Sequence, residues 1–354
     1  MKTEQAAPLA DVACCQHVTD YHPPAAAGGA GALQPGDVLD DRFVITEVIS
    51  RSGLALIFKA QDLHNGNADV AVKLPQRERE GDAEFLARFQ REEEIGLGLN
   101  HRFVVKFIAV AAAKSRPYLV TEYLHGCTLA HLMEAMSPLT ERDALKIGSL
   151  LCQALQYLHE NGIIHRDLKP HNVMIGCDGT LQLLDFGLAT AGGAGRGASG
   201  KVALAMGTPD YMAPELVQGK PGDARTDIYS LGAMLYEMLS GRAPFEGDNP
   251  LCAMNARLLG DPVPLRELNP AISPQVEAIV QHAMERHPAR RHVAAAALRA
   301  ELDNPAAVTP GGSGGSDVES GPGRAKAGQV LLAAMALLLP VAAALWFWLR
   351  IGVH

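Results

Sequence analysis

The sequence lacks an excess of basic residues. Lysine and arginine total 31, against 39 aspartate and glutamate residues, and the formal net charge at pH 7 is -8. Domains that bind nucleic acid carry a basic footprint, and no basic run occurs in this chain. The composition therefore argues against a nucleic-acid binder.

Cysteine is scarce and scattered. The six cysteines stand at positions 14, 15, 127, 152, 177 and 252, without framework-like spacing, and no secretory signal opens the sequence. This pattern argues against a disulfide-scaffolded secreted domain and predicts that the bulk of the chain lies in a reducing cytoplasm. Cys14, Cys15, His17 and His22 lack the paired spacing of metal ligands, so an unstructured tail is favoured over a metal site there.

Large apolar side chains are also rare in residues 1–36, which contain the run PPAAAGGAGA. Such a segment cannot bury enough surface to offset its ordering entropy, so we expect it to be disordered. The segments FVITEVI, LALIFKA and ADVAVKL then follow from Phe43, and their apolar and β-branched residues predict an antiparallel sheet. FVVKFIAVAAA and RPYLVTEYL are interpreted as two further strands.

Polar chemistry is concentrated in residues 164–174, IHRDLKPHNVM. The segment before it, LTERDALKIGSLLCQALQYLHENG, predicts a helix with a capping box at Thr140 and Asp143 and an end at Gly162. The segment after it, LQLLDFGLA, places Asp185 at the end of a short apolar strand. We therefore expect two carboxylates and Asn172 to converge on one metal and phosphate site.

Three motifs occur in order: HRDLKPHN, DFG and GTPDYMAPE. With them the chain, from about Asp41 to about Leu302, resembles the eukaryotic-like Ser/Thr protein kinases, and its layout resembles the bacterial membrane-anchored members. The resemblance implies an α+β, two-lobed fold over residues 41–303, with a β-rich N-lobe at 41–121 and a helical C-lobe at 125–303. It implies transfer of the γ-phosphate of ATP to Ser or Thr hydroxyls of protein substrates.

The resemblance also assigns roles to site residues. Asp167 corresponds to the base that accepts the substrate proton, and Lys169 to a cation on the transferring phosphoryl group. Asn172 and Asp185 correspond to Mg²⁺ ligands. Lys73 of VAVK corresponds to the lysine that contacts the phosphates and pairs with a helix-borne glutamate, which the spacing back from His101 identifies as Glu92.

The family's Gly-rich loop over the phosphates is altered here. Its three usual glycine positions hold Ser50, Ser52 and Ala55, and only Gly53 remains. A Cβ hinders close approach of backbone amides to phosphate, so a pseudokinase scaffold with weakened nucleotide binding stays open as the alternative. The resemblance also implies a hinge at Glu122 to Leu124, whose backbone groups would bind adenine. The residues expected around the nucleotide from this loop and the hinge are Ile49, Ser50, Ser52, Gly53, Ala55, Ile57, Glu122 and Leu124.

Further family positions concern support and regulation. Asp227 matches the aspartate that holds the catalytic-loop backbone, and Glu215 and Arg291 match a structural ion pair. A phosphate on Thr190 or Ser199 of the Gly/Ala-rich activation segment would pair with Arg166. Gly96 stands where the family has a large apolar residue, and we hypothesise that Phe107 fills the space.

The C-terminal region differs in composition from the rest. Residues 304–328 are rich in Gly, Pro and Ser and are interpreted as a flexible linker. The uncharged run from Val330 to Leu349 matches the roughly 20 residues that span a bilayer, which predicts a transmembrane helix at 329–350 and a short tail at 351–354. We expect a single-pass protein of the cell membrane with its kinase domain in the cytoplasm, and a homodimer that phosphorylates itself in trans.

Overall fold

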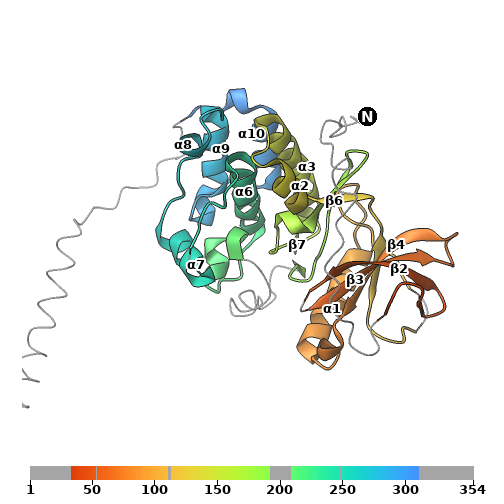
Figure 1. The fold of residues 1–354 in the computed structure, drawn as a ribbon. Coiled ribbons are helices and arrows are strands. Elements are labelled where there is room, and N and C mark those ends of the chain that lie inside the picture. Colours follow the sequence, from red (N-terminus) through yellow and green to blue (C-terminus); the bar gives the residue numbers. More distant parts are fainter. Residues whose placement is uncertain (1–32, 53, 111–112, 192–208, 248, 311–354) are drawn as a thin grey trace, which may run out of the picture. The chain divides into compact units, whose positions relative to one another are not determined.

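The computed structural model describes residues 33–52, 54–110, 113–191, 209–247 and 249–310. Its first lobe is built on an antiparallel sheet in the strand order β1-β2-β3-β4-β5 (Figure 1). The strands are β1 (Val38–Leu39), β2 (Phe43–Arg51), β3 (Ala55–Asp62), β4 (Ala68–Pro75) and β5 (Leu119–Glu122). Phe43 and Ile45 of β2 and Val70 and Val72 of β4 are buried, which is the alternation that gives a sheet one apolar face.

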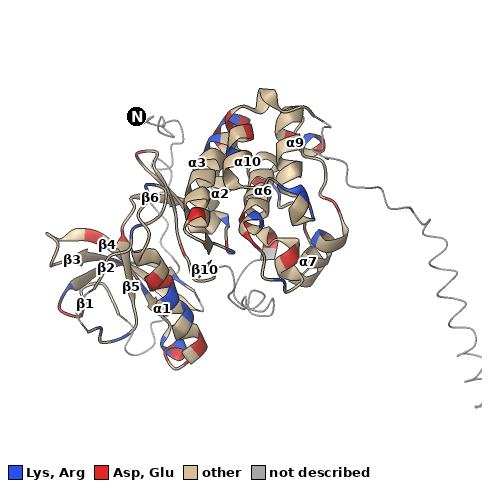
Figure 2. Cartoon of the chain, turned by 180° about the vertical axis from the view of Figure 1, so that it is seen from behind, with Lys and Arg blue, Asp and Glu red and all other residues tan. Residues whose placement is uncertain are grey.

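One long helix belongs to this lobe. After the 3₁₀ turn η2 (Arg77–Arg79), α1 (Ala83–Leu97) begins at the cap Asp82, whose carboxylate accepts hydrogen bonds from the backbone N–H groups of residues 84 and 85. Phe85, Phe89 and Ile95 of α1 are buried, and Figure 2 shows charged residues of both signs along the same helix. The helix is thus amphipathic, and its apolar face fixes its orientation.

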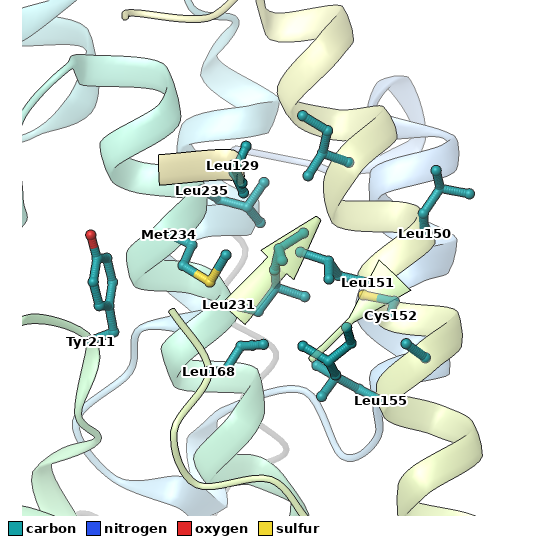
Figure 3. Packing of buried hydrophobic residues seen from close by; sticks show 14 of the residues in the cluster. Leu129, Leu150, Leu151, Cys152, Leu155, Leu168, Tyr211, Leu231, Met234 and Leu235 are labelled. Atoms are coloured by element: carbon teal, nitrogen blue, oxygen red, sulfur yellow. The ribbon is translucent and has the colours of Figure 1, made fainter. Parts of the chain in front are cut away.

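The second lobe is mainly helical. Its helices are α2 (Leu129–Met136), α3 (Glu141–Glu160), α5 (Pro214–Val217), α6 (Ala224–Ser240), α7 (Pro250–Leu259), α8 (Leu265–Leu268), α9 (Pro274–Ala283) and α10 (Ala295–Asp303). Leu151 of α3 and Leu231 and Met234 of α6 are buried between the two helices (Figure 3). The predicted cap Thr140 begins α3, and Gly162 follows its end with a φ of 72°, a conformation that favours glycine.

Short strands flank the loops that lie between the two lobes. One small sheet has the order β6 (Gly126–Thr128), β8 (Val173–Gly176), β9 (Leu181–Leu183), and β7 (Ile163–Ile164) pairs with β10 (Thr190–Ala191). Four 3₁₀ turns complete the second lobe: η3 (Pro170–Asn172), η4 (Pro209–Tyr211), η5 (Pro288–Arg290) and η6 (Pro305–Ala307). Cys127 and Cys177, on β6 and just after β8, are disulfide-bonded, which the sequence spacing did not predict.

Some boundaries differ from the sequence predictions. Residues 33–36 were assigned to the disordered segment, but Leu33 packs on the sheet core and the Gly36 N–H donates to the Ile45 carbonyl at 2.8 Å. Residues 305–308 were assigned to the linker, but they form η6, and Val308 packs against the helical core. In both places a single apolar side chain extends the folded part beyond the compositional boundary.

The predicted strand FVVKFIAVAAA is wrong. In the described part of this stretch, which leaves out residues 111–112, only isolated bridges form, between Val104 and Leu183 and between Phe107 and Thr121. The backbone of residues 103 and 105 bonds to Leu183, whereas that of residues 106 and 108 bonds to β5. The predicted transmembrane helix lies outside the described residues. Within the part of the chain that the structure describes, no helix is long and apolar enough to cross a bilayer.

Candidate active site

A lysine shared by two carboxylates links the sheet to the second lobe. Lys73 of β4 lies 2.8 Å and 3.0 Å from the two carboxylate oxygens of Glu92 of α1, and 3.2 Å from Asp185 Oδ1. Glu92 is buried, whereas Glu93 pairs with Lys114 and Glu94 is exposed. The expected ion pair is therefore present, and it involves the glutamate that the spacing selected.

The two carboxylates that share Lys73 have their pKa values shifted in opposite directions. Burial would raise the pKa of Asp185, but the charge of Lys73 and the N–H of Gly187 hold it well below its usual range. Burial raises the pKa of Glu92 to about 7, since the charge of Lys73 offsets only part of the desolvation. Burial alone would lower the pKa of Lys73, yet the two carboxylates raise it above its usual value. Asp185 is thus ionised at neutral pH, as a hard metal ligand must be.

Residues 165–172, the catalytic loop, contain Asp167, the other carboxylate that was expected at the site. The ammonium of Lys169 lies 2.7 Å from Asp167 Oδ2, and the amide nitrogen of Asn172 donates to Asp167 Oδ2 at 3.2 Å and to the Asp167 carbonyl at 2.8 Å. Asp167 accepts the hydrogen bonds of the Asn172 side-chain nitrogen. The side-chain oxygen of Asn172 therefore remains available to bind a cation. Asn172 and Asp185 together thus supply an oxygen donor set that fits Mg²⁺, which prefers oxygen ligands.

Asp227 of α6 holds this loop from below. Its carboxylate accepts hydrogen bonds from the backbone N–H groups of His165 and Arg166, each at 2.9 Å, and it lies 2.8 Å from His159 Nε2. Burial would raise the pKa of Asp227, but these partners lower it below the usual value. The prediction for Asp227 is confirmed. The contact of His159 was missed, although a histidine next to the buried helical stripe of α3 was a signal for it.

The aromatic ring of the DFG motif packs between the lobes. Phe186 contacts His165, with ring centroids 5.6 Å apart, and Phe107, at 6.1 Å. A Cβ built on Gly96 of α1 would overlap the ring of Phe107. The hypothesis that Phe107 occupies the space next to Gly96 is confirmed.

The altered phosphate loop is closed by its own serine. The hydroxyl of Ser52 accepts hydrogen bonds from the N–H groups of Leu54, at 3.3 Å, and Ala55, at 3.1 Å, and lies 3.0 Å from the Ala55 carbonyl. Gln76 also donates to the Ser52 carbonyl. The side chain thus accepts from two backbone amides of the turn, a contact that the sequence did not reveal.

The other predicted nucleotide positions lie on neighbouring strands. Ile49 stands at an irregularity of β2, and Ser50 pairs with Ile57, which in turn pairs with Lys73. Gly53 lies outside the described residues. Glu122 ends β5, where it pairs with Lys106 at 3.4 Å, and Leu124 follows two residues later. The structure brings Ile57 next to Lys73 in the sheet register.

The expected structural ion pair involves Glu215, the last residue of the GTPDYMAPE motif. Arg291 donates two hydrogen bonds of 2.8 Å to the carboxylate of Glu215 of α5, and both side chains are buried. Thr190 lies in β10, opposite Ile164, and Ser199 lies outside the described residues. Arg166 has a φ of 64°, and its buried Nε has no hydrogen-bond partner among the described residues.

A protein kinase domain has this two-lobed fold, the ion pair of Lys73 with Glu92, and aspartates at the positions of Asp167 and Asp185. A family model of the protein kinase domain matches residues 45–302, and the chain belongs to this family. It is 36% identical over 268 residues to serine/threonine-protein kinase PknB of Mycobacterium tuberculosis and to PknB of Mycolicibacterium smegmatis, covering 75% of this chain and 43% of each relative. A probable serine/threonine-protein kinase PknB of Corynebacterium glutamicum is 35% identical over 273 residues, 75% of this chain and 42% of the relative. The chain thus spans less than half the length of these relatives.

Proposed function

We propose that the chain is a serine/threonine protein kinase that transfers the γ-phosphate of ATP to Ser or Thr hydroxyls of proteins. The observation that carries this proposal is that Glu92 and Asp185 both lie within hydrogen-bond distance of Lys73. The names of the similar proteins support the choice of Ser and Thr as substrates. The comparisons give no support to the scaffold alternative, and every charged group that the chemistry needs is retained.

Each residue has a task in this reaction. Asp167, held by Lys169, accepts the proton of the substrate hydroxyl, and Lys73 provides a fixed positive charge beside the phosphates. Glu92 keeps the lysine in position. Asn172 and Asp185 would hold Mg²⁺, which when bound neutralises charge on the phosphate oxygens.

Replacement of the two charged groups tests the proposal. Asp167→Asn and Lys73→Met should each lower phosphate transfer from labelled ATP at least about 100-fold, because a positioned acid or base contributes about 10²-fold or more. Neither change opens a core cavity, so thermal unfolding should stay close to that of the unaltered chain. Asp261→Asn and Lys220→Met are the matched controls, because both residues are exposed on the second lobe. Near-normal transfer by either site variant would show that the assigned role is wrong.

We further propose that the protein is anchored in the cell membrane by a single helix at 329–350, with the kinase domain in the cytoplasm where ATP is available. The support is the uncharged 20-residue run from Val330 to Leu349, with Trp346 and Trp348 near its end. Confinement to a membrane raises the effective concentration of neighbouring kinases and favours a homodimer that phosphorylates in trans.

A further inference from the structure

We propose that His282, His292 and Glu301 form a binding site for a divalent transition-metal ion such as Zn²⁺, outside the candidate active site. The three side chains come from different places in the second lobe: the last turn of α9, the residue after Arg291, and α10. Among the described residues they are the group of three potential ligands whose donor atoms all lie within 4.8 Å of one another.

The distances between the donor atoms suit a zinc-sized ion. His292 Nε2 lies 2.8 Å, and His282 Nδ1 3.9 Å, from Glu301 Oε2. The two imidazole rings are tilted by 35°, with centroids 3.9 Å apart. Ligands at about 2.0–2.2 Å from a tetrahedral Zn²⁺ are separated by about 3.3–3.6 Å. The two donor separations from Glu301 bracket that range, and the two rings would have to turn and move apart for both to bind one ion.

His292 is the buried member of the group, with a side chain only 1% exposed. Its Nε2 lies within hydrogen-bond distance of Glu301 and is the atom that would bind the ion, whereas its Nδ1, which has no hydrogen-bond partner among the described residues, lies on the other edge of the ring. The support for a metal is therefore the convergence of three donor atoms from the end of α9, the loop before α10 and α10 itself.

The chemistry of the ligands selects the kind of ion. Two imidazoles and one carboxylate suit Zn²⁺ and its first-row neighbours, whereas Mg²⁺ prefers oxygen donors alone. His282 and Glu301 are 37% and 32% exposed, so an ion can enter from solvent and keep water in a fourth position. These ligands differ from the oxygen ligands of the candidate active site. Mg²⁺ would therefore not compete with Zn²⁺ for the site of His282, His292 and Glu301.

The ion would tie together the elements that hold Arg291. Arg291 precedes His292 in the chain, and besides its ion pair with Glu215 it donates hydrogen bonds to the carbonyls of Arg225, Glu285 and Arg286. A metal bridge from α9 to α10 would restrain this segment on its C-terminal side. We therefore expect bound metal to stabilise the second lobe.

Titration of the purified full chain with Co²⁺, a coloured substitute for Zn²⁺, tests the site. We expect one equivalent to bind with visible bands and without the near-ultraviolet charge-transfer bands of thiolate ligands, and millimolar Mg²⁺ should not displace it. Glu301→Gln and His282→Gln should weaken binding at least about 100-fold, since even outer-shell changes at metal sites cost about 10–100-fold. His287→Gln is the matched control, because His287 is an exposed histidine near the site.

Thermal unfolding supplies the second readout. Zn²⁺ should raise the Tm of the unaltered chain and of His287→Gln but not that of Glu301→Gln. His292→Gln removes a buried ring and is informative only if it folds, so the two exposed ligands carry the test. The proposal is overturned if no equivalent binds at micromolar metal, or if Glu301→Gln and His282→Gln bind like the unaltered chain. It is also overturned if thiolate bands appear and vanish with Cys14→Ala and Cys15→Ala, which would assign the ion to the N-terminal cysteines.

Discussion

Glu92 and Asp185 share one lysine, and only Glu92 has its pKa raised toward neutrality, to about 7. Below that pH Glu92 takes up a proton and ceases to hold Lys73 as an anion. We therefore expect kcat/KM for ATP to rise with pH up to about 7, with a limb that approaches tenfold per pH unit on the acid side. Initial rates between pH 5.5 and 8.5 at constant ionic strength would measure it.

Two variants separate Glu92 from other groups. Glu92→Gln should have low activity and a pH profile without the acid limb. Glu93→Gln, which removes the charge of a glutamate that pairs with Lys114, should keep the acid limb. The pKa of Glu92 is raised by folding, so the linked stability is present at acid pH and is lost as the pH rises through about 7. Glu92→Gln should therefore lose that part of the pH dependence of Tm. An unchanged limb in Glu92→Gln would assign the titration to another residue.

Gly96 and Phe107 form the second residue pair with a measurable consequence. A leucine at 96 would gain about 1 kcal/mol in helix propensity over glycine, but it would drive the ring of Phe107 toward Phe186. Overpacking of this kind costs about 1–3 kcal/mol. We expect Gly96→Leu to lower the free energy of unfolding and the phosphotransfer rate.

A double-mutant cycle tests the explanation. Phe107→Ala combined with Gly96→Leu should recover stability relative to Gly96→Leu alone, because the two changes exchange volume. Gly98→Ala is the control, since a Cβ at Gly98 meets nothing closer than 3.4 Å. If the two substitutions were additive, Phe107 would not be the residue that excludes a side chain at 96.

At the scale of elements, the turn between β2 and β3 is held by a side-chain hydroxyl, that of Ser52. Ser52→Gly and Ser52→Ala both remove the hydroxyl that accepts from the amides of Leu54 and Ala55. Each hydrogen bond is worth about 0.5–1.5 kcal/mol, so freeing these amides for phosphate should lower KM for ATP about three- to tenfold.

The glycine series sharpens this prediction. Ser50→Gly, in the strand pairing opposite Ile57, should have the smaller effect, and the triple change that also converts Ala55 should bind ATP most tightly. Nucleotide affinity by calorimetry and steady-state kinetics would rank the variants. A substantial loss of activity in Ser52→Gly would mean that the hydroxyl or the stiffness of the turn is needed.

The elements that sequence predicted well are those with a local signal. Apolar and β-branched segments predicted the antiparallel sheet, and capping chemistry at Thr140 and Gly162 predicted both ends of α3. The motif spacing also identified Glu92 as the partner of Lys73. In each case the information lies within a few residues or a fixed motif order.

Contacts without a local signal were missed. The bond of His159 to Asp227 and the closure of the phosphate loop by Ser52 depend on how folded elements meet. The stretch at 103–113 has the composition of a strand, but the backbone of its described residues bonds first to Leu183 and then to β5 and forms only bridges there. The cluster of His282, His292 and Glu301 arises because two helix ends and a loop come together, which spacing alone does not indicate.

At the scale of the whole molecule, the folded part extends to the last described residues. The helical core is closed by α10, with Leu298 and Leu302 buried, and by Val308 packed against it. The Gly/Ser-rich residues that follow have too few large apolar side chains to add to a core. We therefore expect the proposed membrane helix to be separable from the folded part of the chain.

We expect a chain truncated before Gly328 to be a soluble, active kinase, because truncation there keeps every described residue. Its activity toward an added peptide should match that of the full chain. Its autophosphorylation should become slower at low concentration, since the membrane no longer concentrates the enzyme. The matched control is the full chain in detergent at the same concentration. Fractionation is the decisive measurement: recovery of the full chain in the soluble fraction without detergent, or unfolding of the truncated domain, would contradict the membrane anchor or the separability on which this prediction depends.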